Sequence, residues 1–321
     1  MTAPDVRYTK ENAPLFEKAL PVCLDENDVG QIVDFIKDRL NNRGNFKLLD
    51  LGVGTGQVFI PLFKKFRERT TGFTATVVDN NVHMLECFRK NCLKQDVRVD
   101  TIKILQKEFE DFVVDDIDCL EEQDIILMTR VLHQLGNWRG FLEDLLAKWD
   151  ARGVFVLTES FGDLYNALNF VEPKGGSQQA TVIFQHLNDF FGTEHQIFFK
   201  GKGNIEISAI DMKPVKDFFE SKGFRVEKLM EIKWIDKKNS WNDYLEFTRK
   251  RVFTPIFSPF SHKEDEYETK ICLLDKKMRG TFKKYNWDLN APVNEELGVS
   301  FFYSFKDKKT LRPSHNSEGK D

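Results

Sequence analysis

The chain has 321 residues, of which 41% are hydrophobic and 31% charged, so it carries enough apolar side chains for a packed core. Lysine and arginine number 47 against 51 aspartates and glutamates, and this net charge of -4 argues against a dedicated binder of nucleic acid or of anionic membranes. The 30 phenylalanines, beside 6 tyrosines and 5 tryptophans, favour an apolar pocket or lid in addition to the core.

The cysteine pattern and the apolar runs bear on compartment. Five scattered cysteines without C-x-x-C spacing favour free thiols in a reducing compartment, and no metal site is predicted. The first residues lack a basic segment followed by an apolar run, and no apolar stretch approaches the roughly 20 residues of a membrane helix. We therefore expect a soluble, cytoplasmic protein.

Residues 1–45 are predicted to form helices. Apolar side chains recur there at three- and four-residue steps, at Val29, Ile32, Val33, Ile36 and Leu40. Asn41, Asn42 and Gly44 are typical of a helix end.

Residues 46–160 alternate between short apolar runs and amphipathic segments. Strands are predicted at 47–51, 73–78, 101–105, 124–128 and 154–158. Helices are predicted at 57–69, 83–93 and 141–149, with Pro61 in the first turn of the first of these. Such alternation predicts a parallel sheet covered by helices on both faces.

The alternation stops after Ser160. Residues 161–205 resemble an insertion, and the core resumes over 206–235 with a helix at 215–222 and a strand at 225–232. Residues 236–297 are predicted to be a helical, aromatic segment, residues 298–306 a last strand and residues 307–321 a charged tail. We expect one α/β domain with a seven-stranded, mostly parallel sheet.

The most informative segment is the glycine-rich turn that follows the first predicted strand. Gly52, Gly54 and Gly56 lie between that strand and a helix, where glycine lets the backbone turn sharply and approach a ligand closely. The spacing differs from the G-x-G-x-x-G pattern of dinucleotide sites. Asp50, two residues before the turn, suits a ligand with an ammonium group better than a pyrophosphate. Asp79, at the end of the next strand, is placed to accept both hydroxyls of a ribose.

The run Asp50-Leu51-Gly52-Val53-Gly54-Thr55-Gly56 resembles the first motif of class I S-adenosylmethionine-dependent methyltransferases. The resemblance covers roughly residues 46–160 and, more weakly, 211–235. It implies a Rossmann-like fold, with residues 46–160 and 206–235 as the cofactor-binding core and S-adenosyl-L-methionine as the cofactor. The implied cofactor-binding residues are Asp50, Gly52, Gly54, Gly56, Asp79, Asn80, Glu108, Phe109 and Arg130.

Three of these residues carry specific expectations from the resemblance. Asp79 matches the family's ribose acid. Glu108 falls at the position that accepts the adenine amino group, where the family more often has aspartate. Arg130 could meet a carboxylate of the cofactor or substrate, or could lie on the surface. Arg130 and His133 are also the candidates for catalysis, although a lone histidine at a strand end is more often structural.

The residues outside the common sheet are expected to select the substrate. The segment 236–297 would form a helical substrate cap, which resembles the architecture of the small-acid and small-amine methyltransferases of the trans-aconitate, juvenile-hormone-acid and histamine types. Trp241, Tyr244 and Phe247 have helical spacing, which by itself indicates a core stripe.

The sequence favours a methyltransferase that acts on a small carboxylate or amine. Because the methyl donor is already activated, such an acceptor needs no strong base, and no His/acid pair is evident. An RNA or protein methyltransferase is an alternative, which the charge and the absence of an Asn-Pro-Pro-Tyr-like strand end disfavour. A non-catalytic member of the fold that binds cofactor or a partner is another.

Overall fold

The structure is a computed structural model. It describes residues 8–19, 24–42, 44–132, 135, 137–149, 154–162, 179–180, 182–183, 185–187, 189–190, 213–252 and 264–307. The candidate His133, most of the segment 161–205 and the tail from residue 308 lie outside the described residues.

Seven strands of the described chain form one sheet in the order β3-β2-β1-β4-β5-β7-β6. They are β1 (Asn45–Leu51), β2 (Gly72–Asp79), β3 (Ile102–Gln106), β4 (Ile125–Thr129), β5 (Val154–Gly162), β6 (Phe224–Asp236) and β7 (Glu295–Asp307). The pairs among β1 to β5 are parallel, and β7 runs antiparallel to both β5 and β6. The predicted seven-stranded, mostly parallel α/β fold is confirmed, with last strands that are longer than predicted.

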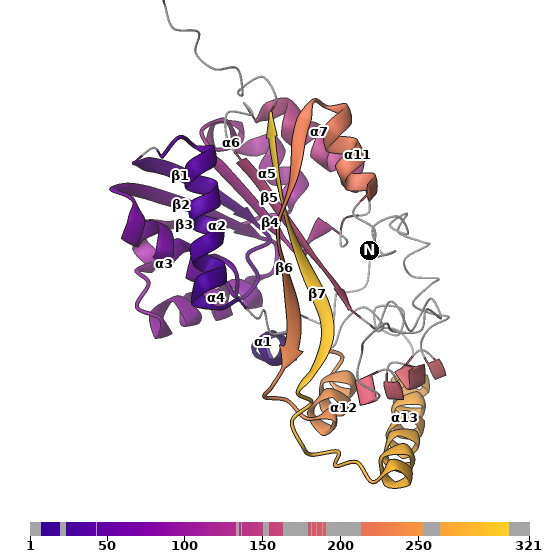
Figure 1. The fold of residues 1–321 in the computed structure, drawn as a ribbon. Coiled ribbons are helices and arrows are strands. Elements are labelled where there is room, and N and C mark those ends of the chain that lie inside the picture. The colour runs from indigo at the N-terminus through magenta and orange to yellow at the C-terminus, as the bar shows by residue number, and fades with distance from the viewer. Residues whose placement is uncertain are drawn as a thin grey trace, which may run out of the picture.

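Helices cover both faces of this sheet (Figure 1). On one face lie α2 (Glu26–Arg39), α3 (Phe59–Arg69) and α4 (Val82–Lys94). On the other lie α5 (Phe109–Asp115), α6 (Ile117–Glu121), α7 (Trp138–Lys148) and α11 (Lys213–Ser221). The sequence analysis did not predict α5 and α6, because both are shorter than the pattern that marks an amphipathic helix. No helix in the described part of the chain has the length and hydropathy to span a bilayer.

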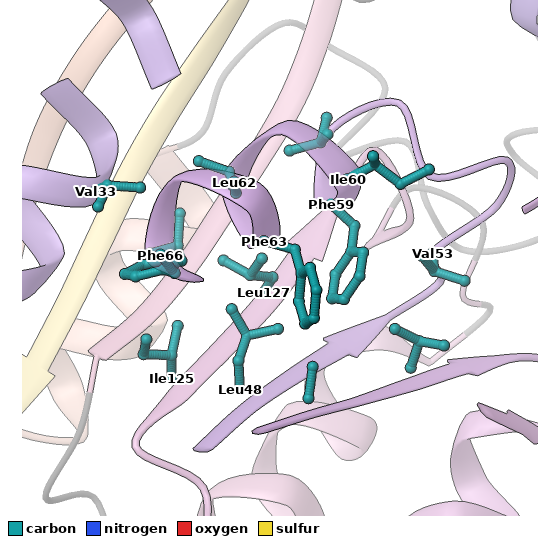
Figure 2. Packing of buried hydrophobic residues seen from close by; sticks show 14 of the residues in the cluster. Val33, Leu48, Val53, Phe59, Ile60, Leu62, Phe63, Phe66, Ile125 and Leu127 are labelled. Carbon is teal, nitrogen blue, oxygen red and sulfur yellow. The ribbon is translucent and has the colours of Figure 1, made fainter. Parts of the chain in front are cut away.

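The first core lies between α3 and the central strands. Phenylalanines at 59, 63 and 66 point from α3 towards β1 and β4, where Leu48 and Leu127 meet them (Figure 2). The next residues along these strands, Leu49 and Met128, face the second core on the other side of the sheet. Burial on both faces explains why β4 begins with the continuous apolar run Ile125–Met128.

β6 and β7 continue past the shared sheet to a group of helices at one end of the molecule (Figure 1). These are α12 (Trp241–Arg249) and α13 (Glu264–Tyr285). Trp241, Tyr244 and Phe247 are buried in a third core of their own, so the core stripe predicted from their spacing is confirmed. The short helix α1 (Ala13–Ala19) contacts both α4 and α12, and so lies between the sheet and this cap.

Candidate functional site

The candidate site lies where β1 and β4 end side by side. The chain goes from β1 to β2 and β3 in one direction across the sheet, and β4 pairs with the opposite edge of β1. A reversal of this kind leaves a crevice outside the carboxyl ends of the two strands, because the connecting helices depart to opposite faces. The glycine-rich turn follows β1 at this edge of the sheet.

All three glycines of the turn need left-handed backbone angles. Their φ values are +83° at Gly52, +55° at Gly54 and +87° at Gly56. A Cβ on Gly52 would collide with the side chain of Val131, and one on Gly56 would lie 2.7 Å from the ring of Phe88. The backbone conformation therefore favours glycine at all three positions, and close packing favours it also at Gly52 and Gly56.

Asp79 fastens the turn to β2. Its Oδ2 accepts the Gly54 N–H at 2.9 Å, and its Oδ1 accepts the Asn81 N–H at 2.9 Å. The side chain is only 8% exposed, and burial raises the pKa of Asp79, an effect that these two N–H bonds oppose. A carboxylate has about four lone-pair sites, so Asp79 retains capacity for hydroxyl donors of a ligand.

Asp50 is the most unusual residue of the site. It is 1% exposed, and neither of its carboxyl oxygens has a hydrogen-bond partner within the described residues. Burial, reinforced by the negative charge of Asp79, raises the pKa of Asp50 to about 8. A buried polar group without a partner costs free energy, and this carboxyl would be stabilised by a ligand that brings a cation or N–H donors.

Asn80 and Glu108 form an exposed rim beside the two buried acids. The Asn80 amide donates to Glu108 Oε2 at 3.0 Å, and the charge of Glu108 contributes to the raised pKa of Asp79. Phe109 is half-buried next to the rim, and its ring edge lies close to Gly52. The structure thus brings Asn80, Glu108 and Phe109 together with the glycine turn, and a role for them in cofactor binding stays a prediction.

Arg130 follows β4 directly, at the other side of the crevice. It is half-buried and has φ +57°, a left-handed conformation uncommon outside glycine. This bend turns the chain so that the next residue, Val131, packs on Gly52. A role for Arg130 in binding a carboxylate stays a prediction, and the candidate His133 lies outside the described residues.

Two site residues were missed by the sequence analysis. Asn81 caps α4, with its side chain accepting from the N–H groups of His83 and Met84, and its own N–H binds Asp79. Asn91 donates to the carbonyl of Thr55 inside the glycine turn at 3.1 Å. An Asn before an apolar helix is a cap signal that could have revealed Asn81, whereas only the fold brings Asn91 to the turn.

A metal centre has no candidate ligands in the part of the chain that the structure describes. No group of three or more His, Cys, Asp or Glu side chains is arranged there to hold an ion.

Comparison with known proteins identifies relatives in structure only. No family model and no curated protein matches the sequence. The structure is similar to that of YjhP from E. coli, with a TM-score of 0.50 and 12% identity over 95% of this chain and 100% of that one. It is also similar to YcgJ from Bacillus subtilis (TM-score 0.49, 14% identity, 88% of this chain and 100% of that one). A third similar structure is that of a SAM-dependent methyltransferase from Geobacter sulfurreducens in complex with S-adenosyl-L-homocysteine (TM-score 0.48, 10% identity, 96% of this chain and 100% of that one). At such identities the likeness shows the fold alone, a Rossmann-like α/β fold.

Proposed function

We propose that the chain is an S-adenosylmethionine-dependent methyltransferase whose acceptor is a carboxylate or an amine of a small molecule. The observation that carries the proposal is Asp50, a buried carboxyl with no hydrogen-bond partner among the described residues, two positions before a turn of three left-handed glycines. Asp79 at the end of the neighbouring strand supplies the second acid. Both acids lie next to the glycine turn that carries the sequence resemblance, which supports the proposal.

These residues fit the proposed cofactor group by group. Asp50 would pair with the ammonium of the methionine part, which supplies both the charge and the N–H donors that its carboxyl lacks. Asp79 would accept from the ribose hydroxyls while it holds the turn through Gly54. Glu108 and Asn80 lie on the rim, where an adenine amino group would find an acceptor. Phe109 would provide an apolar wall for the base.

The protein's contribution to methyl transfer is positioning and exclusion of water. The cofactor supplies a methyl group on a sulfonium, which is already activated for attack. Holding the acceptor in line with that group removes most of the remaining barrier, without a strong base when the acceptor is a carboxylate or a free amine. The cap of α12 and α13 and the bridging helix α1 are the elements suited to cover the acceptor.

Calorimetry on the purified protein tests the cofactor assignment. S-adenosyl-L-homocysteine is expected to bind, and Asp79→Ala is expected to weaken binding at least about tenfold, because it removes hydrogen bonds to a charged group. Asp118→Ala, which replaces an exposed acid on α6, serves as the control and should bind as the unchanged protein does. Absence of binding together with a clear signal for NAD or ATP would overturn the proposal.

The acceptor class is tested separately. The protein is incubated with a cell extract and isotope-labelled S-adenosylmethionine, and the products are separated by mass spectrometry. A labelled small acid or amine supports the proposal. Label in RNA or protein would instead indicate an RNA or protein methyltransferase. Cofactor binding without any labelled product would favour a non-catalytic role.

A further inference from the structure

Asn91 is a polar residue on an otherwise apolar, buried helix face. On α4 it follows Met84 and Phe88 at helical spacing, and these three side chains are all buried. Asn91 itself is only 8% exposed. A leucine would fill such a position without the cost of burying an amide, so the amide calls for a specific partner.

The amide has two partners, on opposite sides. Its Nδ2 donates to the carbonyl of Thr55 at 3.1 Å and to Oε2 of Glu17 at 2.8 Å. Thr55 lies between Gly54 and Gly56, so the bond reaches the middle of the glycine turn. From β2, Asp79 accepts the Gly54 N–H and the Val78 carbonyl accepts the Gly52 N–H. Asn91 therefore fixes the turn from the side of α4.

Glu17 belongs to α1, which is fastened to the cap at its other side. The Asn12 amide donates to the carbonyl of Lys250 at 2.9 Å, and the Asn239 amide donates to the carbonyl of Lys18 at 2.7 Å. Ala13 packs with Met84, whose terminal methyl would lie 3.5 Å from a Cβ on Gly54. The helix thus touches both the cap and the wall of the turn.

We propose that Asn91 is a positioning residue of the cofactor site, whose amide fixes the Thr55 carbonyl and, through Glu17, makes helix α1 a structural part of that site. The inference rests on the proposed function, since it names residues that support the same turn. Because the turn must keep its backbone preorganised to meet a nucleoside, loss of this anchor reduces affinity without touching any ligand atom. The same hydrogen bonds connect the cap to the cofactor turn by way of α1.

Binding of S-adenosyl-L-homocysteine by calorimetry, with thermal unfolding measured on each variant, tests the proposal. Asn91→Ala is expected to weaken binding about tenfold and Glu17→Ala about threefold, the range that single hydrogen bonds produce. Glu17→Gln keeps an acceptor for the Asn91 amide and is expected to restore binding to within about twofold. The matched control is Asn242→Ala in α12, which removes an exposed hydrogen bond from Arg279 and is expected to leave affinity unchanged.

Hydrogen–deuterium exchange of the ligand-free protein gives a second readout that needs no ligand. Asn91→Ala is expected to speed exchange of the Gly56 N–H, which donates to the Val53 carbonyl within the turn. If the unchanged protein binds and the Asn91 and Glu17 variants bind equally well with unaltered exchange at the turn, the inference is wrong and the proposed function stands. If the unchanged protein does not bind at all, both fall together.

Discussion

Replacing Asp50 with asparagine is expected to stabilise the ligand-free protein at neutral pH while it weakens cofactor binding. The carboxyl is buried and has no partner among the described residues, and burial raises its pKa to about 8. At pH 7 the folded protein therefore keeps the group protonated, whereas the unfolded chain ionises it in water. Ionisation stabilises the unfolded state, and asparagine, which does not ionise, removes this stabilisation.

The size of the effect follows from the two pKa values. For each pH unit between the ordinary pKa of 3.8 and pH 7, ionisation of the unfolded chain lowers the free energy of unfolding by about 1.4 kcal/mol, or by about 4 kcal/mol in all. The asparagine amide buries N–H donors at the same place, and an unpaired donor costs about 1–3 kcal/mol. The net gain in the free energy of unfolding at pH 7 is thus about 1–3 kcal/mol.

The pH dependence distinguishes this reasoning from a general change in packing. At pH 4, close to the ordinary pKa of 3.8, ionisation of the unfolded chain contributes little, so the cost of the amide prevails and Asp50→Asn is expected to be the less stable form. As the pH rises from 4 to 8, the unchanged protein loses stability relative to the variant. Urea unfolding of both proteins, without ligand, at several pH values between 4 and 8 measures the difference. A difference that stays constant with pH, or a variant that is less stable at pH 7–8, would refute the argument.

Two further outcomes follow from the same site. Cofactor binding at pH 7 is expected to release close to one proton, because the ammonium of the cofactor lowers the pKa of Asp50 from about 8 in the free protein. Calorimetry in buffers of different ionisation enthalpy measures this proton release, and Asp50→Asn should abolish the release. Gly52→Ala is expected to reduce the free energy of unfolding by about 2–4 kcal/mol, since φ is +83° and the new methyl meets Val131. Gly280→Ala in α13, where a Cβ would meet no described atom within 4 Å, should instead raise the free energy of unfolding by about 0.5–1 kcal/mol. Urea unfolding measures both changes, and equal effects at the two glycines would contradict the reasoning.

The alternation of apolar runs and amphipathic segments was sufficient to predict the parallel part of the sheet. The run Ile125–Met128 is buried on both faces, and that double burial is visible in the sequence as an unbroken apolar stretch. The lengths of β6 and β7 were underestimated, because their ends extend towards the cap rather than into the common core. Charged residues at those ends, such as Asp236 in β6 and Glu295 in β7, conceal the strands from a hydrophobic pattern.

The sequence by itself determined the chemistry available at the turn: the three glycines, the acid two residues before them and the acid at the end of the next strand. Local spacing suffices there, since strand, turn and helix are consecutive in the chain. Tertiary structure alone decided the environment of those groups. It leaves Asp50 buried without a hydrogen-bond partner among the described residues, and it joins Asn91 to Thr55, 36 residues away, and to Glu17, 74 residues away. Burial and long-range hydrogen bonds depend on which surfaces the whole chain brings together, and no local pattern records them.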